Sequence, residues 1–123
     1  MDVVAMVLVA VVAAIHVYIV LLEMVWWKTP RGMQAFGTDA AFAERSAPLA
    51  ANQGLYNGFL VAGLVWGLLA ADPVGFQVSV FFLGCVIVAG LFGAATVSRR
   101  ILVVQAFPAV LALGAVLLAG SAV

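Results

Sequence analysis

The residues best suited to bind a ligand lie where a long apolar segment begins with amides and a phenol. Positions i, i+1, i+4 and i+5 of this segment are occupied by Asn52, Gln53, Tyr56 and Asn57. On a helix that turns about 100° per residue, they fall within one arc of roughly 140°. Polar side chains in hydrocarbon cost several kcal/mol unless they find partners. Other helices must therefore bring polar groups to this face, which predicts a polar site there.

Ionisable residues also lie in the first apolar segment. One narrow stripe, at i, i+4, i+7 and i+11, holds His16, Val20, Glu23 and Trp27. Counted back from Trp27 at about 1.5 Å per residue, Glu23 is expected roughly 6 Å below the cytoplasmic boundary and His16 about 16 Å deep. The two are about 10 Å apart along the axis, so each needs a partner elsewhere. Because an unpaired Glu in a membrane helix costs roughly 2.5–3.5 kcal/mol, we expect Glu23 to face a bundle interior, against an Arg, an amide or a phenol.

These residues and others from later segments are expected at similar depths, in the cytoplasmic half of the membrane. The candidate ligand-binding residues are His16, Glu23, Arg45, Asn52, Gln53, Tyr56, Asn57, Arg99 and Gln105. They predict a polar intramembrane pocket that opens to the cytoplasm and is closed on the outer side by aliphatic helix ends. The alternative is that the amides and the phenol are packing contacts between helices, each worth about 0.6–2 kcal/mol. Close approach of another helix is favoured by a neighbouring stripe of small residues, Ala50, Gly54, Gly58 and Ala62.

A metal site, a disulfide framework and a nucleophilic catalytic site all lack matching residues in the sequence. One His and one Glu seven positions apart make no metal-ligand set. The single cysteine, Cys85, excludes a disulfide framework. No Ser, His and Asp, or Cys and His, are expected at one depth for nucleophilic catalysis. The sequence therefore assigns no catalytic residue and no metal ligand, and it leaves open whether the protein is an enzyme.

The composition decides the class of protein that holds these residues. Of 123 residues, 67% are hydrophobic and 8% are charged, and the mean hydropathy is +1.30. A soluble domain of this size has too little interior for so much apolar surface. Segments long enough to cross a hydrocarbon core about 30 Å thick span residues 3–27, 49–71, 74–97 and 101–122. The predicted fold is all-α, an integral membrane bundle of four transmembrane helices that forms one domain over residues 1–123, with residues 28–48 as a cytoplasmic loop.

The distribution of charge predicts the orientation of this bundle. Two connections hold all five basic residues, which are Lys28, Arg31 and Arg45 in the first and Arg99 and Arg100 in the second. By the positive-inside rule, both connections are cytoplasmic and both termini face outward. We expect a multi-pass protein of the inner (plasma) membrane, with the lipid bilayer, a lipid-like small molecule and further copies of the chain as its partners. The formal net charge of zero argues against nucleic-acid binding.

Local signals predict how the first two helices end and begin. Pro30 and Gly32 are expected to end the first helix. Pro48 is compatible with two layouts. It either lies in the first turn of a helix that Ser46 caps, or it kinks a longer helix that begins near Asp39. The second layout is favoured slightly, because it continues the polar face toward the cytoplasm.

Signals in the second half of the chain predict close helix packing. Gly63 and Gly67 form a further pair of small residues one turn apart. The connection between the third and fourth segments is very short, which predicts an antiparallel hairpin. Pro108 lacks an amide hydrogen and should free a backbone carbonyl near Val104.

Several motifs stand in the order and at the spacing of a known family, and they read HVYIVLLEM, TPRG, FG and AANQGLYNGFLVAGLVWGL. Along nearly its whole length, the chain resembles the small four-helix bacterial membrane proteins known as domain of unknown function 1304. This resemblance implies the fold and the membrane location. It implies no activity, because none is assigned to that family.

A shorter stretch resembles the MAPEG superfamily, the membrane-associated proteins of eicosanoid and glutathione metabolism. Glu44–Arg45 precede Asn52, and Tyr56 follows it by four residues, which is similar to the entry of the second helix in that superfamily. Pro48 and Leu55 stand where the superfamily has a further Arg and an acidic residue. The resemblance implies a homotrimer with sites between subunits, each lined by helices one, two and four.

The MAPEG resemblance also implies an activity. It would make the chain a membrane enzyme that uses a thiol cofactor such as glutathione. Arg45, Asn52 and Arg99 would hold the anionic cofactor, and Tyr56 would assist the ionisation of its thiol.

The polar residues by themselves favour two other functions. The first is binding of a small lipid-like or amphipathic molecule, whose polar head would be held by Glu23, Asn52, Tyr56 and Asn57. The second is a small proton-coupled carrier in which His16 and Glu23 titrate.

Overall fold

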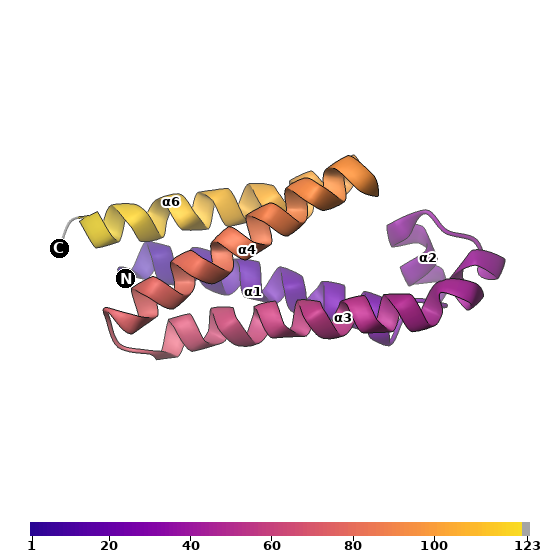
Figure 1. Cartoon of the computed structure of the whole chain (residues 1–123), viewed down its shortest axis with the longest axis horizontal. Coiled ribbons are helices and arrows are strands. Elements are labelled where there is room, and N and C mark those ends of the chain that lie inside the picture. Colours follow the sequence, from indigo (N-terminus) through magenta and orange to yellow (C-terminus); the bar gives the residue numbers. More distant parts are fainter. Residues whose placement is uncertain (122–123) are drawn as a thin grey trace. The chain divides into compact units, whose positions relative to one another are not determined.

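The helices of the chain follow its apolar segments, with changes at their ends. The computed structural model describes residues 1–121, and over these residues it contains helices and turns but no strand. The long helices are α1 (Val3–Met24), α3 (Ala40–Leu69), α4 (Val74–Thr96) and α6 (Phe107–Ser121). The shorter elements are α2 (Pro30–Phe36), α5 (Arg99–Ile101) and a π-helical turn, η1 (Leu102–Ala106) (Figure 1). The predicted end of the last helix at Ala122 lies outside the described residues.

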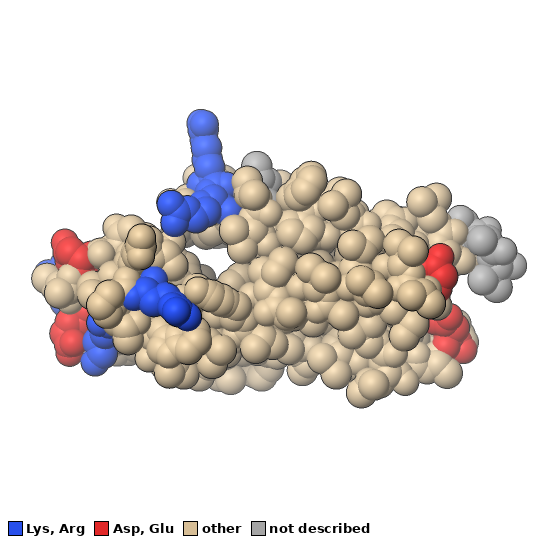
Figure 2. Space-filling view, turned by 180° about the vertical axis from the view of Figure 1, so that it is seen from behind, with Lys and Arg blue, Asp and Glu red and all other residues tan. Residues whose placement is uncertain are grey.

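Three helical stretches of the described chain are long and apolar enough to cross a membrane. They are Val3–Met24, Val74–Thr96 and the continuous run Arg99–Gly120. Most of the face seen in Figure 2 is uncharged, as a lipid-facing surface requires. The second predicted span falls in α3, whose amide side chains lower its hydropathy. The all-helical fold is therefore confirmed with three candidate spans, and the fourth span stays a prediction.

The first connection differs from the sequence prediction. α1 ends at Met24 instead of Trp27, and Pro30, which was expected to end the first helix, begins α2. Thr29 caps α2, because its Oγ1 accepts a hydrogen bond from the Gly32 amide at 3.3 Å. A proline is favourable at the first helical position, where its missing amide hydrogen costs nothing. Residues 28–48, predicted as a loop, therefore contain α2 and the first part of α3.

α3 begins as the favoured layout predicts. The Asp39 carboxylate caps it by accepting a hydrogen bond from the Phe42 amide at 2.8 Å. The helix continues through Pro48 for 30 residues, a length of about 45 Å. Ser46 does not cap a new helix, since its hydroxyl donates to the Phe42 carbonyl at 2.7 Å within the same helix.

The chain divides into two compact units. The loop unit, His16–Phe59, contains the second part of α1, all of α2 and the first part of α3. The core unit consists of Met1–Ile15 together with the described residues from Leu60 onward. The single domain predicted from the sequence stays a prediction.

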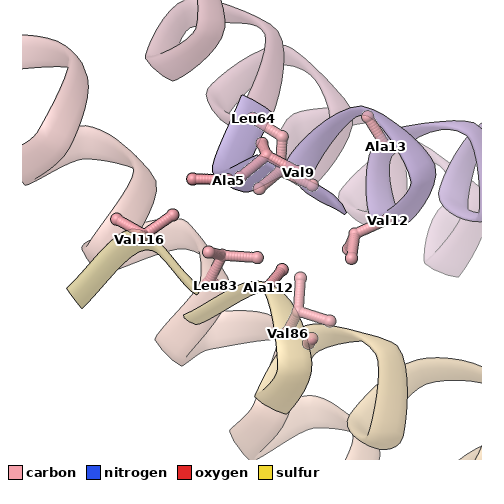
Figure 3. Packing of buried hydrophobic residues seen from close by; sticks show 10 residues of the cluster. Ala5, Val9, Val12, Ala13, Leu64, Leu83, Val86, Ala112 and Val116 are labelled. Atoms are coloured by element: carbon pink, nitrogen blue, oxygen red, sulfur yellow. The ribbon is translucent and has the colours of Figure 1, made fainter. Parts of the chain in front are cut away.

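The core unit is held together by small and branched aliphatic side chains from α1, α3, α4 and α6. Figure 3 labels its buried residues Ala5, Val9, Val12, Ala13, Leu64, Leu83, Val86, Ala112 and Val116. On α1, α4 and α6, most of these residues recur at spacings of three or four, so that they share one face of their helix. Where lipid surrounds a bundle, van der Waals packing of such faces is a main force between helices.

Glycines bring the helices of the core unit close together. Gly63 packs against the ring of Phe82, and Gly67 packs against Ser79. A Cβ atom at Gly90 would lie only 2.9 Å from the backbone nitrogen of Ala106. The prediction of a close helix contact at Gly63 and Gly67 is confirmed.

α4 and the run that ends in α6 form the predicted hairpin and lie side by side (Figure 1). Gly93 closes α4, because its carbonyl accepts hydrogen bonds from the amides of Val97 and Ser98. The π-helical turn η1 directly precedes α6, in which Pro108 is the second residue. A proline leaves the carbonyl four residues earlier, that of Val104, without its helical partner. Such interruptions of the hydrogen-bond ladder are where π-turns and kinks occur.

Candidate functional site

Glu23 and Asn57 form a buried polar pair within the loop unit. Glu23 is the second-last residue of α1, and Asn57 lies in the middle of α3. The Asn57 Nδ2 donates a hydrogen bond to the Glu23 Oε1 at 2.5 Å. Glu23 is 2% exposed and Asn57 is 8% exposed. A buried carboxyl group requires such a partner, and the amide is one of the partners expected for Glu23.

Gly54 permits the close contact at this pair. It lies one turn before Asn57 on α3. A Cβ atom at Gly54 would collide with the Met24 side chain and would lie 3.2 Å from the Glu23 Cβ. The absence of a side chain at this position therefore lets α3 lie against α1 at the level of the carboxyl group.

The predicted stripe of small residues is only half correct. Ala50 and Gly54 are buried, whereas Ala62 is exposed. At Gly58, no atom of the described chain outside the helix backbone lies within 4 Å of an added Cβ. The physical reason is that four buried side chains of α3, those of Ala43, Ala50, Asn57 and Leu64, follow a seven-residue repeat. A four-residue repeat rotates away from that line by about 40° per step, so its later members leave the contact.

The other polar residues of α3 lie on a different side of the helix. Asn52, Gln53 and Tyr56 are exposed, and so is Arg45, two turns before Asn52. These four residues form the exposed polar face of α3. Asn57 is five residues after Asn52, a rotation of about 140°, which is enough to bury one amide and expose the other. The structure therefore divides the predicted polar site into a buried pair and an exposed face.

Three predicted site residues lie elsewhere. His16 is fully buried on α1, seven residues before Glu23. Gln105 is buried in η1, and Arg99 is exposed in α5. These last two belong to the core unit. Of the nine predicted residues, Glu23 and Asn57 are in direct contact.

Trp26 and Trp27 organise the loop unit around the end of α1. The Trp27 Nε1 donates a hydrogen bond to the Ser46 Oγ at 3.0 Å. The Trp27 ring lies 4.9 Å from the Phe36 ring, centroid to centroid. The Arg31 guanidinium carbon stands 5.3 Å from the centroid of the Trp26 ring, a distance at which cation–π attraction acts. The two tryptophans therefore connect the end of α1 to both α2 and α3.

A shallow depression of about 390 Å³ opens beside the turn between α1 and α2. Its lining residues are Trp26, Thr29, Pro30 and Arg31. The sequence prediction missed it, because residues 28–48 were expected to be a loop. A threonine followed by proline is a helix-start signal, so the Thr29-Pro30 pair was the available indication of α2.

The sequence matches, over residues 10–117, the family described as "Protein of unknown function (DUF1304)". The chain belongs to the DUF1304 family. The matched region contains the whole loop unit and every predicted site residue of this DUF1304 protein. Comparison with curated proteins and with solved structures found no match. The family predicted from the motifs is thus confirmed, while the resemblance to MAPEG is not shown.

The exposed polar face gives this DUF1304 protein a set of hydrogen-bond donors with one positive charge. In the loop unit, Lys28 is paired with Glu44 at 3.5 Å, whereas none of the ion pairs found among residues 1–121 includes Arg45. Asn52 and Gln53 contribute amides that both donate and accept, and Tyr56 contributes a phenol. Within the described part of the chain, no three His, Cys, Asp or Glu side chains are grouped to hold a metal ion. The chemistry available at this face is recognition of polar and anionic groups.

Proposed function

We propose that this protein binds a small amphipathic, lipid-like molecule at the cytoplasmic end of α3. The observation that carries the proposal is the separation of the polar residues on that helix. Glu23 has its partner in Asn57, while Asn52, Gln53 and Tyr56 are exposed. Exposed polar side chains in hydrocarbon are costly without partners. A molecule with a polar head and an apolar chain supplies those partners and keeps the surrounding surface apolar.

The proposal includes α3 as a fourth transmembrane helix. Its length of about 45 Å exceeds the hydrocarbon thickness of about 30 Å, so it can cross with its first turns outside. If α3 did not cross, the connection with Lys28 and the one with Arg99 would lie on opposite sides of the membrane. With α3 crossing, all five basic residues lie on the cytoplasmic side of the inner membrane, as the positive-inside rule favours. Both termini then face outward, and the polar face of α3 opens to the cytoplasm.

Native mass spectrometry of the full chain released from detergent tests the binding proposal. We expect the wild type to carry a small amphipathic molecule, whose occupancy falls several-fold in Asn52→Ala and in Tyr56→Phe. The matched control is Gln77→Ala, since Gln77 is an exposed amide on α4. The same spectra report whether the chain is a monomer or a homo-oligomer.

Two results would contradict the binding proposal. One is a wild-type chain that carries no small molecule after gentle extraction. The other is an equal loss of ligand in Gln77→Ala, which would show that any amide lost from the surface has the same effect. A thermal shift with glutathione would favour the enzyme predicted from the MAPEG resemblance, and proton-dependent uptake into liposomes would favour the carrier.

Cysteine labelling tests the fourth span separately. In a Cys85→Ser background, we expect Gln34→Cys in α2 to react with an impermeant maleimide only from the cytoplasmic side. Ala71→Cys, after the end of α3, should react only from the outside. Labelling of both positions from the same side would contradict a membrane-spanning α3.

A further inference from the structure

We infer that the molecule bound at the exposed polar face carries an anionic headgroup at Arg45 and extends its apolar chain along α3 past Tyr56. This inference rests on the proposed function and specifies the class of ligand. The ligand class is an acidic amphiphile, with a phosphate or carboxylate at one end and an acyl chain at the other.

Five exposed residues of α3 lie on one line along the helix. Positions i, i+4, i+7, i+11 and i+14 are Arg45, Leu49, Asn52, Tyr56 and Phe59. All five are exposed, with Leu49 75%, Tyr56 59% and Phe59 54% accessible. This spacing keeps residues on one side of a helix, and 14 residues cover about 21 Å. The line is therefore long enough for a headgroup and the first part of an acyl chain.

The charges of the loop unit identify Arg45 as the residue for an anion. Lys28 already has an ion-pair partner in Glu44, at 3.5 Å. Arg31 lies over the Trp26 ring. Arg45 belongs to neither of the ion pairs found among the described residues, and a guanidinium binds phosphate or carboxylate through paired hydrogen bonds.

After Arg45, the residues on this line of α3 change from hydrogen-bond donors to apolar rings. This is the order in which the carbonyl linkages and the acyl chain follow the headgroup in a lipid. The Asn52 amide and the Tyr56 hydroxyl provide donors for ester or amide carbonyls. The rings of Tyr56 and Phe59 meet edge-on with centroids 5.8 Å apart, and they present an apolar surface to an acyl chain. Charge, hydrogen-bond donors and apolar surface therefore follow one another along α3.

The Trp27–Ser46 hydrogen bond indicates the depth of Arg45 in the membrane. Tryptophans concentrate at the membrane–water interface, and Trp27 is bonded to the residue that follows Arg45. Arg45 is therefore expected among the lipid headgroups, where a basic residue attracts acidic lipids.

The test compares three lipids with identical oleoyl chains, added to the full protein in an uncharged detergent. The lipids are the anionic dioleoyl phosphatidylglycerol, the zwitterionic dioleoyl phosphatidylcholine and the neutral dioleoylglycerol, and binding is measured by native mass spectrometry. We expect phosphatidylglycerol to bind about fivefold more tightly than phosphatidylcholine. That preference should disappear in Arg45→Gln and persist in the matched variant Arg31→Gln.

The outcomes separate this inference from the proposed function on which it rests. A preference for phosphatidylglycerol that survives in Arg45→Gln overturns the inference. Equal binding of all three lipids that falls in Asn52→Ala also overturns it, while leaving the proposed function intact. Displacement of bound phosphatidylglycerol by millimolar inorganic phosphate would show that a free anion, not an amphiphile, is the ligand. Assembly of copies that excludes lipid from this face would overturn both.

Discussion

The side chains of Glu23 and Asn57 share a hydrogen bond of 2.5 Å, although 34 residues separate them in the sequence. The bond connects α1 to α3 at a point where both groups are withdrawn from solvent. The hydrogen bond itself contributes modestly to the free energy of unfolding. Its loss costs more, because a buried carboxyl group would then have no partner.

Removal of the Asn57 amide should therefore destabilise the protein more than removal of the charge of Glu23. We expect Asn57→Leu to lower the free energy of unfolding by about 1–3 kcal/mol. Glu23→Gln should cost less than Asn57→Leu, because a Gln amide keeps a hydrogen bond to Asn57. Unfolding by sodium dodecyl sulfate in mixed micelles measures both values. Equal stability of Asn57→Leu and wild type would show that the pair contributes nothing to the fold.

Gly32 should tolerate no side chain. A Cβ there would collide with the Trp26 carbonyl and reach 3.0 Å from the Trp27 Cα. Because these atoms belong to the backbone, relief requires displacement of the whole turn, and we expect Gly32→Ala to cost about 1–3 kcal/mol. Gly58→Ala is the control, since its Cβ position is open and alanine favours a helix by up to about 1 kcal/mol. Thermal unfolding in detergent should rank Gly58→Ala above Gly32→Ala, and the reverse order would refute the contact.

The hydrogen bond between Trp27 and Ser46 should contribute to the stability of the loop unit. We expect Ser46→Ala to lower the free energy of unfolding by about 0.5–1.5 kcal/mol. If the loss is due to this bond, Ser46→Ala should have a clearly smaller effect in a Trp27→Phe background. Additive effects of the two changes in a double-mutant cycle would show that the residues act independently.

Because of Asp72, the stability of the core unit should decrease as the pH falls. The hydrogen bond from the N-terminal amine to its carboxylate, at 2.6 Å, lowers the pKa of Asp72 below its ordinary value of 3.8, with a further contribution from the Phe76 amide. A lowered folded-state pKa means that the stabilisation is complete above the unfolded pKa and is lost as the pH falls through the folded one.

Melting temperatures measured from about pH 6 down to about pH 3 test this dependence. Wild type should lose more stability over that range than Asp72→Asn, whose side chain does not titrate. Parallel melting curves for the two proteins would contradict a role for the ionised carboxylate.

Much of the fold was predictable from composition and local signals. Long apolar runs can bury their backbone polar groups in a membrane only as helices, so the positions of α1, α4 and the last helical run follow from the sequence. The start of α3 near Asp39 was predictable for a local reason as well, since a carboxylate can cap the amide three residues later. The start of α2 has a local signal in Thr29 and Pro30, but the turn after Met24 depends on contacts of Trp26 and Trp27 with residues farther along the chain.

The candidate site was predictable in its residue types but not in its geometry. The residue types alone predict that Glu23 needs a buried partner and that the start of the second apolar segment has a polar side, because unpartnered polar groups in hydrocarbon are costly. The packing of α3 on α1 makes Asn57 that partner and leaves Asn52, Gln53 and Tyr56 outside the contact. The physical reason is rotation about the α3 axis: the residues that touch α1 depend on how two helices pack, and side chains one residue apart on α3 differ by about 100° in direction.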